Sequence, residues 1–187
     1  IRGKDIAMIF QEPMTSLNPF HKVGNQIMES VMSHKKISKH DARLRAMELM
    51  QLVEIPDLER RFDAFPHELS GGQRQRIMIA MALINEPDLL IADEPTTALD
   101  VTIQAQILDL MNRIKEQLGM AILFITHDLG LVEKFSDTVS VMKGGKIVEQ
   151  GNTKEIFSDP EDDYTKKLLN SEPQPKNDTM CDDENIL

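Results

Sequence analysis

The hydrophobic pattern along the chain predicts strands separated by long helical stretches. Ile6–Phe10 is a short β-prone run, and Leu89–Asp93 is a continuous apolar run of the kind found in buried parallel strands. A third strand is predicted at Ala121–Thr126. Between the last two strands, apolar residues recur at helical spacing, namely Ile103, Ile107, Leu110, Ile114 and Leu118. Strand, helix and strand in this order predict a right-handed crossover and a parallel sheet covered by helices, which is an α/β fold.

A second helical region is predicted between the first strand and the second. Across Val23–Phe62 the apolar positions follow a helical period, and Ser38 with Asp41 has the spacing of a capping box. Glycines end this stretch before a further helix, which is predicted at Gln73–Ile84. We therefore expect a helical subdomain, at about residues 23–75, inserted into the α/β domain.

The last third of the chain changes character twice. Thr138–Met142 and Lys146–Glu149, joined through two glycines, predict a β-hairpin. Beyond it the composition becomes polar and acidic, so Ser171–Leu187 is predicted to be a disordered tail or linker. Residues 1–170 are then expected to form the folded domain.

The composition of the chain excludes several classes of protein and of binding site. The chain has 187 residues, 41% of them hydrophobic, which is enough for a sizeable core. Its apolar runs are far shorter than the roughly 20 residues that span a bilayer, so we expect no transmembrane segment. The single cysteine, Cys181, excludes an intramolecular disulfide and a multi-cysteine metal site, and the net charge of −10 argues against nucleic acid as a partner. The chain begins at Ile1 with no export signal, so we expect an internal piece of a longer cytoplasmic protein.

The strongest local signal is a pair of acids, Asp93 and Glu94, directly after the second predicted strand. Parallel sheets bind ligands at the carboxyl ends of their strands. Asp93 could hold Mg²⁺ there, and Glu94 could polarise the water that attacks a phosphoryl group. A solvated turn with two acids is the alternative, and this pair alone leaves it open.

A glycine-rich segment opens the helix that follows the helical region. Ser70, Gly71, Gly72 and Gln73 precede or begin that helix, and its free N–H groups favour an anion. A phosphate could bind there. Taken alone, a Ser70 N-cap followed by a flexible hinge explains the segment better.

Two polar residues follow the other predicted strands. His127 comes after the third strand, where a neutral imidazole could contact a γ-phosphate, and Gln11 comes after the first. Each alone is more often structural or solvated. Together, three neighbouring strand ends direct Gln11, Asp93, Glu94 and His127 toward one edge of one sheet, which favours a functional site.

These motifs, in this order, resemble the nucleotide-binding subunit of ATP-binding cassette (ABC) transporters over Ile6–Leu169. Gln11 is similar to the family's Q-loop, Asp93-Glu94 to the end of its Walker B strand, and His127 to its switch histidine. Leu69–Gln73 matches the family signature, and Ala98-Leu99-Asp100 matches its D-loop.

The resemblance implies a P-loop NTPase-type fold that uses ATP and Mg²⁺. It implies catalytic roles for Glu94, His127 and Gln11, and metal contacts from Asp93 and Gln11. It also implies a second cassette as partner, whose nucleotide is bound in trans by the residues of the signature and D-loop, namely Ser70, Gly71, Gly72, Gln73 and Asp100.

One branch of the family fits best. Phe10–Pro19 is similar to the oligopeptide, dipeptide and nickel importers, and Tyr164–Leu169 looks like that branch's C-terminal motif. This implies ATP-driven peptide uptake at the cytoplasmic face of the inner membrane, with transmembrane permease subunits and, indirectly, a substrate-binding protein. The permease contact is expected in the helical region and at Glu12–Asn18. Ser171–Leu187 could begin a linker to a second cassette.

One family motif is absent. The chain contains no Gly-x-x-x-x-Gly-Lys phosphate loop, so we expect it to be inactive by itself. Two alternatives remain at this point: a soluble cassette ATPase that acts on DNA, and a degenerate remnant that no longer hydrolyses ATP.

Overall fold

The computed structural model describes residues 1–11, 16–97 and 99–171. Its contacts divide the chain into two compact units, Ile1–His127 and Asp128–Leu187. The predicted folded domain of residues 1–170 stays a prediction, and most of the predicted tail, together with Cys181, lies outside the described residues. No helix in the described ranges combines the length and the apolar character that crossing a membrane requires.

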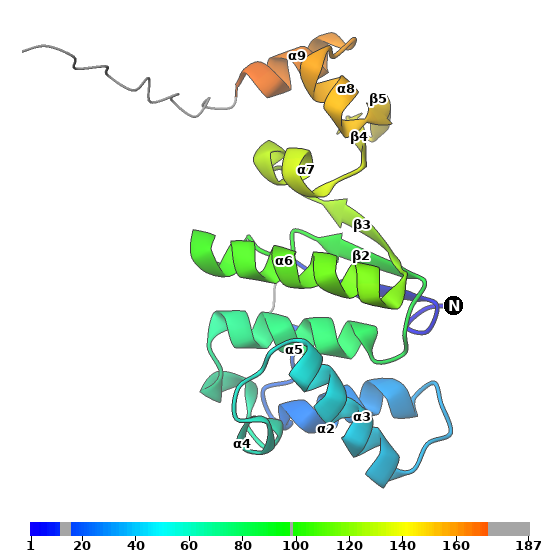
Figure 1. Ribbon diagram of the computed structural model, residues 1–187, viewed down its shortest axis with the longest axis vertical. Coiled ribbons are helices and arrows are strands. Elements are labelled where there is room, and N and C mark those ends of the chain that lie inside the picture. Colours follow the sequence, from blue (N-terminus) through cyan, green and yellow to red (C-terminus); the bar gives the residue numbers. More distant parts are fainter. Residues whose placement is uncertain (12–15, 98, 172–187) are drawn as a thin grey trace, which may run out of the picture. The chain divides into compact units, whose positions relative to one another are not determined.

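The first unit combines a parallel sheet with helices (Figure 1). Its described elements are, in chain order, β1 (Ile6–Ile9), α2 (Val23–Met32), α3 (Lys39–Leu52), α4 (Leu58–Phe62), the short 3₁₀ helix η1 (Pro66–Glu68), α5 (Gly71–Leu83), β2 (Leu89–Asp93), α6 (Val101–Leu118) and β3 (Ala121–Ile125). The strands run parallel in the order β1-β2-β3, so the predicted α/β fold is confirmed.

The sheet is covered unequally on its two faces. Ala7, Ile9, Leu90 and Ala92 are buried in one core cluster, which also includes residues of α5 and α6. Side chains of the other face remain in solvent, among them Leu123 at 50% exposure. In β2, which was predicted to be a buried strand, Leu90 and Ala92 are buried while Leu89, Ile91 and Asp93 are half-buried, so the prediction holds for one face of the strand. The described helices α5 and α6 pack on one face only.

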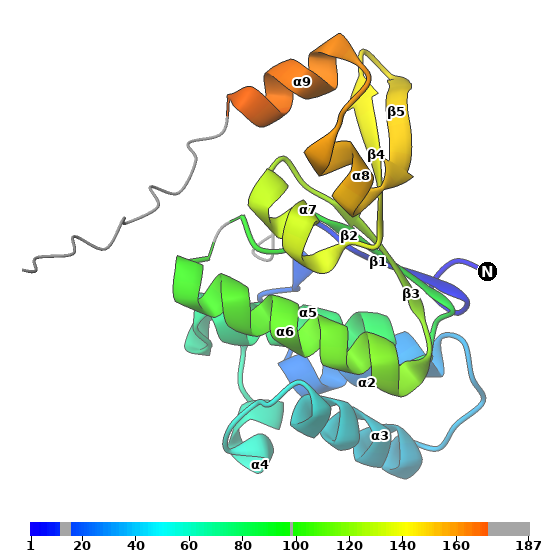
Figure 2. The same ribbon diagram turned by 45° about the horizontal axis from the view of Figure 1, so that its top comes forward.

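Helices α2, α3 and α4 form the predicted helical region (Figures 1 and 2). Ser38 caps α3, since its Oγ accepts the Asp41 N–H at 3.1 Å, as the capping pattern predicted. Gly24 of α2 lies so close to Phe62 that a Cβ there would come within 2.5 Å of the ring. Leu44 is 51% exposed, whereas Ala42 and Ala46 lie on the buried face of α3.

The second unit holds the predicted hairpin. Its elements are α7 (Leu129–Phe135), β4 (Thr138–Lys143), β5 (Lys146–Asn152), α8 (Thr153–Ser158) and α9 (Asp163–Asn170). β4 and β5 pair antiparallel through Gly144 and Gly145, both at positive φ. A two-residue turn that follows the twist of a hairpin requires such a conformation, which glycine adopts without strain.

Candidate functional site

The carboxyl ends of the three parallel strands lie at one edge of the sheet. Their register is direct, with Ile9 opposite Ala92 and Asp93 opposite Ile125. Gln11, Glu94 and His127 each follow within two residues of a strand end. The topology therefore brings the predicted strand-end residues to the same edge.

Glu94 and His127 are in contact. The Glu94 N–H donates to the carbonyl of Ile125 at 2.9 Å, which extends the ladder between β2 and β3 by one step. His127 lies two residues beyond Ile125, and its Nδ1 is 2.5 Å from Oε1 of Glu94. The other carboxylate oxygen of Glu94, Oε2, accepts a hydrogen bond from the Thr97 hydroxyl. Both oxygens of the carboxylate are thus oriented by side chains.

Glu94 sits in an uncommon backbone conformation, with a φ of 47°. The left-handed region is unfavourable for a residue with a Cβ, so the surrounding contacts must hold the turn. Partial burial by itself raises the pKa of Glu94, but the hydrogen bonds from Thr97 and His127 outweigh it and hold the pKa below its ordinary value. Glu94 is therefore an ionised carboxylate at neutral pH, with its side chain only 16% exposed.

Asp93 and Gln11, the two predicted metal contacts, are more exposed to solvent than a buried side chain would be. Asp93 is the last residue of β2 and is half-buried, whereas Gln11 is exposed just after β1. No cluster of three or more histidine, cysteine, aspartate or glutamate side chains that could hold a metal occurs within the described ranges. An ion at Asp93 would therefore take most of its oxygen ligands from a phosphate group and water, as Mg²⁺ commonly does.

A second group of predicted residues gathers where α5 and α6 begin. Ser70 caps α5, with its Oγ accepting the Gln73 N–H at 3.3 Å and the Gln73 side chain accepting the Ser70 N–H at 3.2 Å. Asp100 caps α6 by accepting the Ile103 N–H at 2.9 Å. The predicted start of α5 at Gln73 was two residues late, because Ser70 is the cap and the glycines are its first turn.

Two further candidate residues, Thr97 and Phe20, belong to none of the predicted motifs, and both are identified by local contacts and exposure in the structure. Thr97 became visible only through its bond to Glu94, three residues earlier, the spacing of a side-chain turn. Phe20 is 85% exposed although it is a large aromatic. Its loop is fixed by the buried Gln26, whose Nε2 donates to the carbonyls of Asn18 at 3.0 Å and His21 at 2.9 Å.

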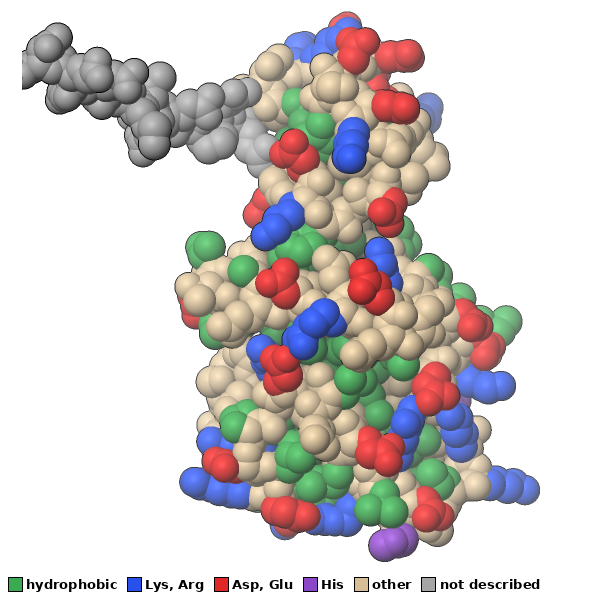
Figure 3. All heavy atoms as spheres, viewed as in Figure 1, with side chains coloured by type: hydrophobic (Ala, Val, Ile, Leu, Met, Phe, Trp, Pro, Cys, Tyr) green, Lys and Arg blue, Asp and Glu red, His purple; other side chains and the backbone are tan. Residues whose placement is uncertain are grey.

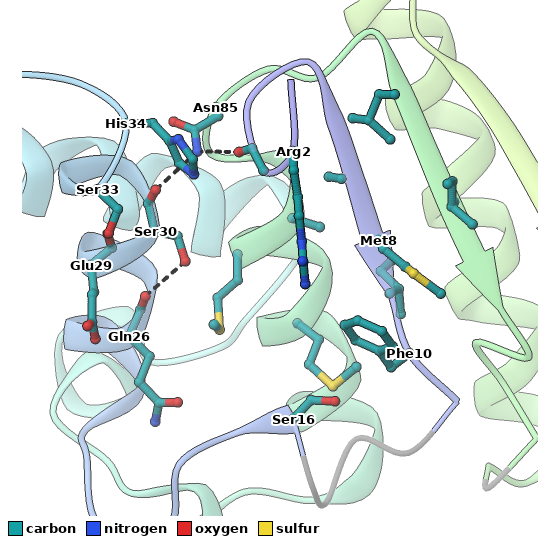
Figure 4. Close-up of a pocket in the computed structure, with 18 of the residues that line it drawn as sticks. Arg2, Met8, Phe10, Ser16, Gln26, Glu29, Ser30, Ser33, His34 and Asn85 are labelled. Carbon is teal, nitrogen blue, oxygen red and sulfur yellow. Dashed lines mark hydrogen bonds between the residues drawn. The ribbon is translucent and has the colours of Figure 1, made fainter.

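A cavity of about 1120 Å³ lies between β1, α2 and α5, away from the acidic pair. Figure 4 shows Gln26 and Glu29 of α2, and Ser33 just after it, across from Met8 of β1 and the nearby Phe10. One end of this cavity borders the loop that carries Phe20. The predicted contact residues Glu12–Thr15 lie outside the described residues, and Leu17 is buried at 3% exposure, so it is part of the core.

A family model and two curated relatives all assign the chain to the ABC transporter family. The family model described as ABC transporter matches residues 1–97, just over half of the chain. The chain is 60% identical over 173 residues to the oligopeptide transport ATP-binding protein OppD of Bacillus subtilis, covering 92% of this chain and 48% of that protein. It is also 60% identical over 174 residues to the peptidoglycan transport ATP-binding protein YejF of Agrobacterium fabrum, covering 93% of this chain and 32% of that protein.

The fold has solved counterparts. The structure of cbiO1 from Clostridium perfringens, part of an ABC transporter complex, is similar with a TM-score of 0.73 and 34% identity, covering 83% of this chain and 60% of that one. A dimeric ATP-binding cassette bound to ADP and Pi is similar with a TM-score of 0.69 and 28% identity, covering 81% of this chain and 64% of that one. The chain thus spans 32% and 48% of the lengths of the two curated relatives described above, which is less than half of each.

Proposed function

Since the chain belongs to the ABC transporter family, we propose that it is part of the ATP-binding and ATP-hydrolysing subunit of an importer that takes up peptides. The observation that carries the proposal is the contact between Glu94 and His127 at the strand-end edge, in a chain 60% identical to an oligopeptide transport ATP-binding protein. Such a subunit works at the cytoplasmic face of the inner membrane, bound to permease subunits that receive peptide from a substrate-binding protein.

In this proposal Glu94 orients and polarises the attacking water. An ionised carboxylate with fixed oxygens accepts a proton from water in a defined direction, and proton transfer of this kind contributes roughly 10²–10⁴-fold to a rate. His127 holds Oε1 of Glu94 and, at 77% side-chain exposure, has room to contact a γ-phosphate as well. Gln11, at the end of β1, completes the edge on the other side of β2.

The substrate in this proposal is ATP bound to Mg²⁺. Asp93 offers one carboxylate at the strand end, and Gln11 offers an amide oxygen. Hard oxygen ligands of this kind suit Mg²⁺, which is usually held by one or two protein ligands together with phosphate oxygens. The residues present therefore fit the ion, whose role is to neutralise phosphate charge during transfer.

A second cassette is the proposed partner in trans. Ser70, Gly71, Gly72, Gln73 and Asp100 lie at the beginnings of α5 and α6, and the positive end of a helix dipole favours an anion. The dimeric form of the similar solved cassette supports this arrangement.

The permease is proposed to dock beside the first strand. Gln26 is only 6% exposed and fixes the loop between Asn18 and His21, so the loop presents Phe20 to solvent in a defined position. An exposed aromatic on a rigid loop next to an apolar cavity is the usual form of an interface anchor. The Q-loop residue Gln11 lies in the same stretch of chain, which would link docking to the nucleotide.

The test is ATP hydrolysis with and without a phosphate loop. The 187 residues contain no Gly-x-x-x-x-Gly-Lys sequence, whose N–H groups and lysine would neutralise the β- and γ-phosphates. We expect no hydrolysis by the chain alone, and Mg-ATP-dependent hydrolysis after fusion at Ile1 to the phosphate-loop segment of an oligopeptide-transport relative. A well-folded fusion without hydrolysis would favour the degenerate-remnant alternative.

The DNA-acting alternative has less support. The chain carries a net charge of −10, and on the face of the molecule in Figure 3 acidic and basic side chains are interspersed without a continuous basic patch. DNA binding requires clustered positive charge to neutralise phosphates. Failure of double-stranded DNA to stimulate hydrolysis by the fusion would exclude this alternative.

A further inference from the structure

Three consecutive residues at the start of α2 contact three consecutive residues at the end of α4. The Val23 N–H, in the first turn of α2, donates to the carbonyl of Ala64 at 2.9 Å. The first N–H groups of a helix have no partner within it, and Val23 is 0% exposed, so this N–H depends on Ala64. Lys22, the N-cap residue, gives the helix no side-chain hydrogen bond, and its Nζ pairs with Oδ1 of Asp63 at 2.9 Å instead.

Gly24 provides the third contact. A Cβ built on it would lie 2.5 Å from three atoms of the Phe62 ring, a distance that real Cβ atoms do not reach. The ring is only 2% exposed, and the guanidinium of Arg43, on α3, lies 4.0 Å from its centroid. The start of α2 therefore rests on a ring that is itself enclosed. Together, residues 22–24 and residues 62–64 form the α2–α4 junction.

Backbone conformation does not require glycine at position 24. Its φ is not in the left-handed region, and the residue lies within a helix, where alanine is more favourable than glycine. The reason for glycine is therefore space, and the Phe62 ring occupies that space.

The α2–α4 junction leads directly to the loop that carries Phe20. Gln26, in the next residues of α2, donates from Nε2 to the carbonyls of Asn18 and His21, and its Oε1 accepts the Asn18 N–H at 2.8 Å. The Phe20 N–H in turn donates to Oδ1 of Asn18 at 3.0 Å. The loop is thus fixed to α2, and α2 is fixed to the end of α4, so a shift of the start of α2 would move Phe20 with it.

We propose that Gly24 is a positioning residue for permease binding: its missing side chain lets α2 rest on Phe62, and this contact sets where the Asn18–His21 loop presents Phe20. The part of this statement that concerns the permease rests on the proposed function. The position of the loop is a property of this chain alone. Gly24 is buried, so it acts on a permease only through the loop.

The first experiment measures thermal unfolding of the 187-residue chain. Gly24→Ala should lower the Tm by roughly 2–8 °C, because the added Cβ overpacks the α2–α4 junction. In a Phe62→Ala background, where the ring is absent, Gly24→Ala should leave the Tm unchanged or raise it. A Phe62→Leu background removes part of the ring and should reduce the drop, so it serves as the comparison where Phe62→Ala does not fold. Asn25→Ala changes the exposed neighbour in the same turn, and as the matched control it should not lower the Tm.

The second experiment measures amide hydrogen exchange in the same chain, because a residue that only stabilises the core would not move the loop. The Asn18 N–H, held by Gln26, reports on the loop, and the Val23 N–H reports on the α2–α4 junction. Gly24→Ala should accelerate the exchange of both more than that of the α6 amides, under conditions where the chain is folded. Ile114→Val, which removes a methyl group from a core residue of α6, should lower the Tm without this preference.

The outcomes separate the positioning role from its alternatives. An equal drop in Tm for Gly24→Ala in the wild-type and Phe62 backgrounds would overturn the proposed contact, as would a rise in Tm in the wild-type background. Exchange that accelerates equally in the loop and in α6 would assign Gly24 a packing role only, and the positioning role would be wrong. Neither measurement requires ATP or a permease, so both remain decisive where the proposed function fails.

The third experiment measures binding of the phosphate-loop fusion to solubilised permease subunits of the oligopeptide transporter that supplies the phosphate-loop segment. Gly24→Ala should weaken binding by about three- to tenfold, at most the effect of losing the aromatic anchor itself, and adding Phe62→Leu should restore part of it. Ile114→Val should leave binding unchanged. Normal binding by Gly24→Ala, together with weakened binding by Phe20→Asp, would overturn the inference and leave the proposed function intact. Absence of binding by the parent fusion would instead count against the proposed function.

Discussion

Two regions of the molecule differ in what they offer a ligand. The strand-end edge comprises Gln11, Asp93, Glu94 and His127, and the corner between α5 and α6 comprises Ser70–Gln73 and Asp100. At the edge, Glu94 is surrounded by side chains that hold each of its oxygens, and the backbone is bent into a left-handed turn to allow it. At the corner, Gly71 and Gly72 contribute no side chains, and the helix starts themselves are the surface. The edge suits a reaction that moves a proton, which needs a specific functional group. The corner suits the binding of a large anion. Such an anion is bound by backbone N–H groups, and it can come close to them only where no side chain is in the way.

The largest expected effect comes from adding a side chain to the corner. Gly71→Asp would place a carboxylate where the partner's γ-phosphate is proposed to lie, and juxtaposed like charges cost several kcal/mol. We expect the ATP-dependent dimer of the phosphate-loop fusion, made hydrolysis-deficient by Glu94→Gln, to disappear in sedimentation. The fold should survive, since Gly71 has room and an acid is favourable in the first turn of a helix. A dimer of normal affinity would contradict the assignment in trans.

The corresponding change at the edge alters one functional group. Glu94→Gln keeps the size of the side chain but removes the negative charge, so ATP binding by the fusion should persist. Turnover should fall at least about 10²-fold, the usual loss for a missing general base. Steady-state phosphate release gives the rate, and calorimetric titration with Mg-ATP gives the binding. Normal turnover in Glu94→Gln would show that Glu94 is not the general base, and the strand-end edge would then have no assigned catalytic group.

A smaller effect is expected where the permease is proposed to dock. Phe20→Asp should weaken binding of the fusion to its permease roughly tenfold, as for loss of an aromatic anchor. Its Tm should change little, because Phe20 is 85% exposed. Ile147→Asp, at a 56% exposed apolar residue of the hairpin, is the matched control and should leave permease binding unchanged. Leu17→Asp should unfold the chain instead, since Leu17 is in the core.

The smallest expected effect concerns the ion pairs by which Glu54 connects α5 to α6. Glu54 accepts hydrogen bonds from Arg113 of α6 at 2.5 Å and Arg76 of α5 at 2.9 Å. The bond from Arg113 is the largest cause of a lowered pKa at Glu54, Arg76 adds to it, and partial burial opposes it. Because the Glu54 carboxyl is half exposed, we expect Glu54→Gln to cost at most about 1 kcal/mol at neutral pH.

The direction of the pKa shift at Glu54 determines how the stability difference between wild type and Glu54→Gln changes with pH. A lowered pKa means that Glu54 stabilises the folded chain above its ordinary value of 4.5 and loses this contribution as the pH falls through its folded pKa. Denaturant unfolding should therefore show the gap between wild type and Glu54→Gln narrowing below pH 4.5. Glu59→Gln, which alters an 81% exposed acid paired with Arg43, should show no comparable gap at any pH.

The topology of the edge could be predicted from sequence, and its detail could not. Parallel strands end at the same edge, so Glu94 and His127 were expected to be neighbours. The bond from Thr97 depends on the left-handed turn at Glu94, and residue propensities do not predict such a turn for glutamate. The close approach of Ile103 to Gly72, where an added Cβ would lie 2.8 Å from Cγ2 of Ile103, depends on how α5 and α6 pack, which is a property of tertiary structure. Leu44 illustrates the same limit, because it is an apolar residue of the helical pattern across Val23–Phe62 and yet is 51% exposed, while the small Ala42 and Ala46 are buried.

The turn at Glu94 belongs to a wider pattern. Within the described residues, the non-glycine positions with positive φ are all acidic: Glu54, Asp57, Glu86 and Glu94. Three of them hold a basic partner: Glu54 binds Arg76 and Arg113, Glu86 binds Arg45, and Glu94 binds His127. Attraction between charges weakens with ionic strength, whereas backbone strain does not. These turns lie between α3 and α4, between α5 and β2, and between β2 and α6. We therefore expect added salt to weaken the charge pairs that hold these strained conformations.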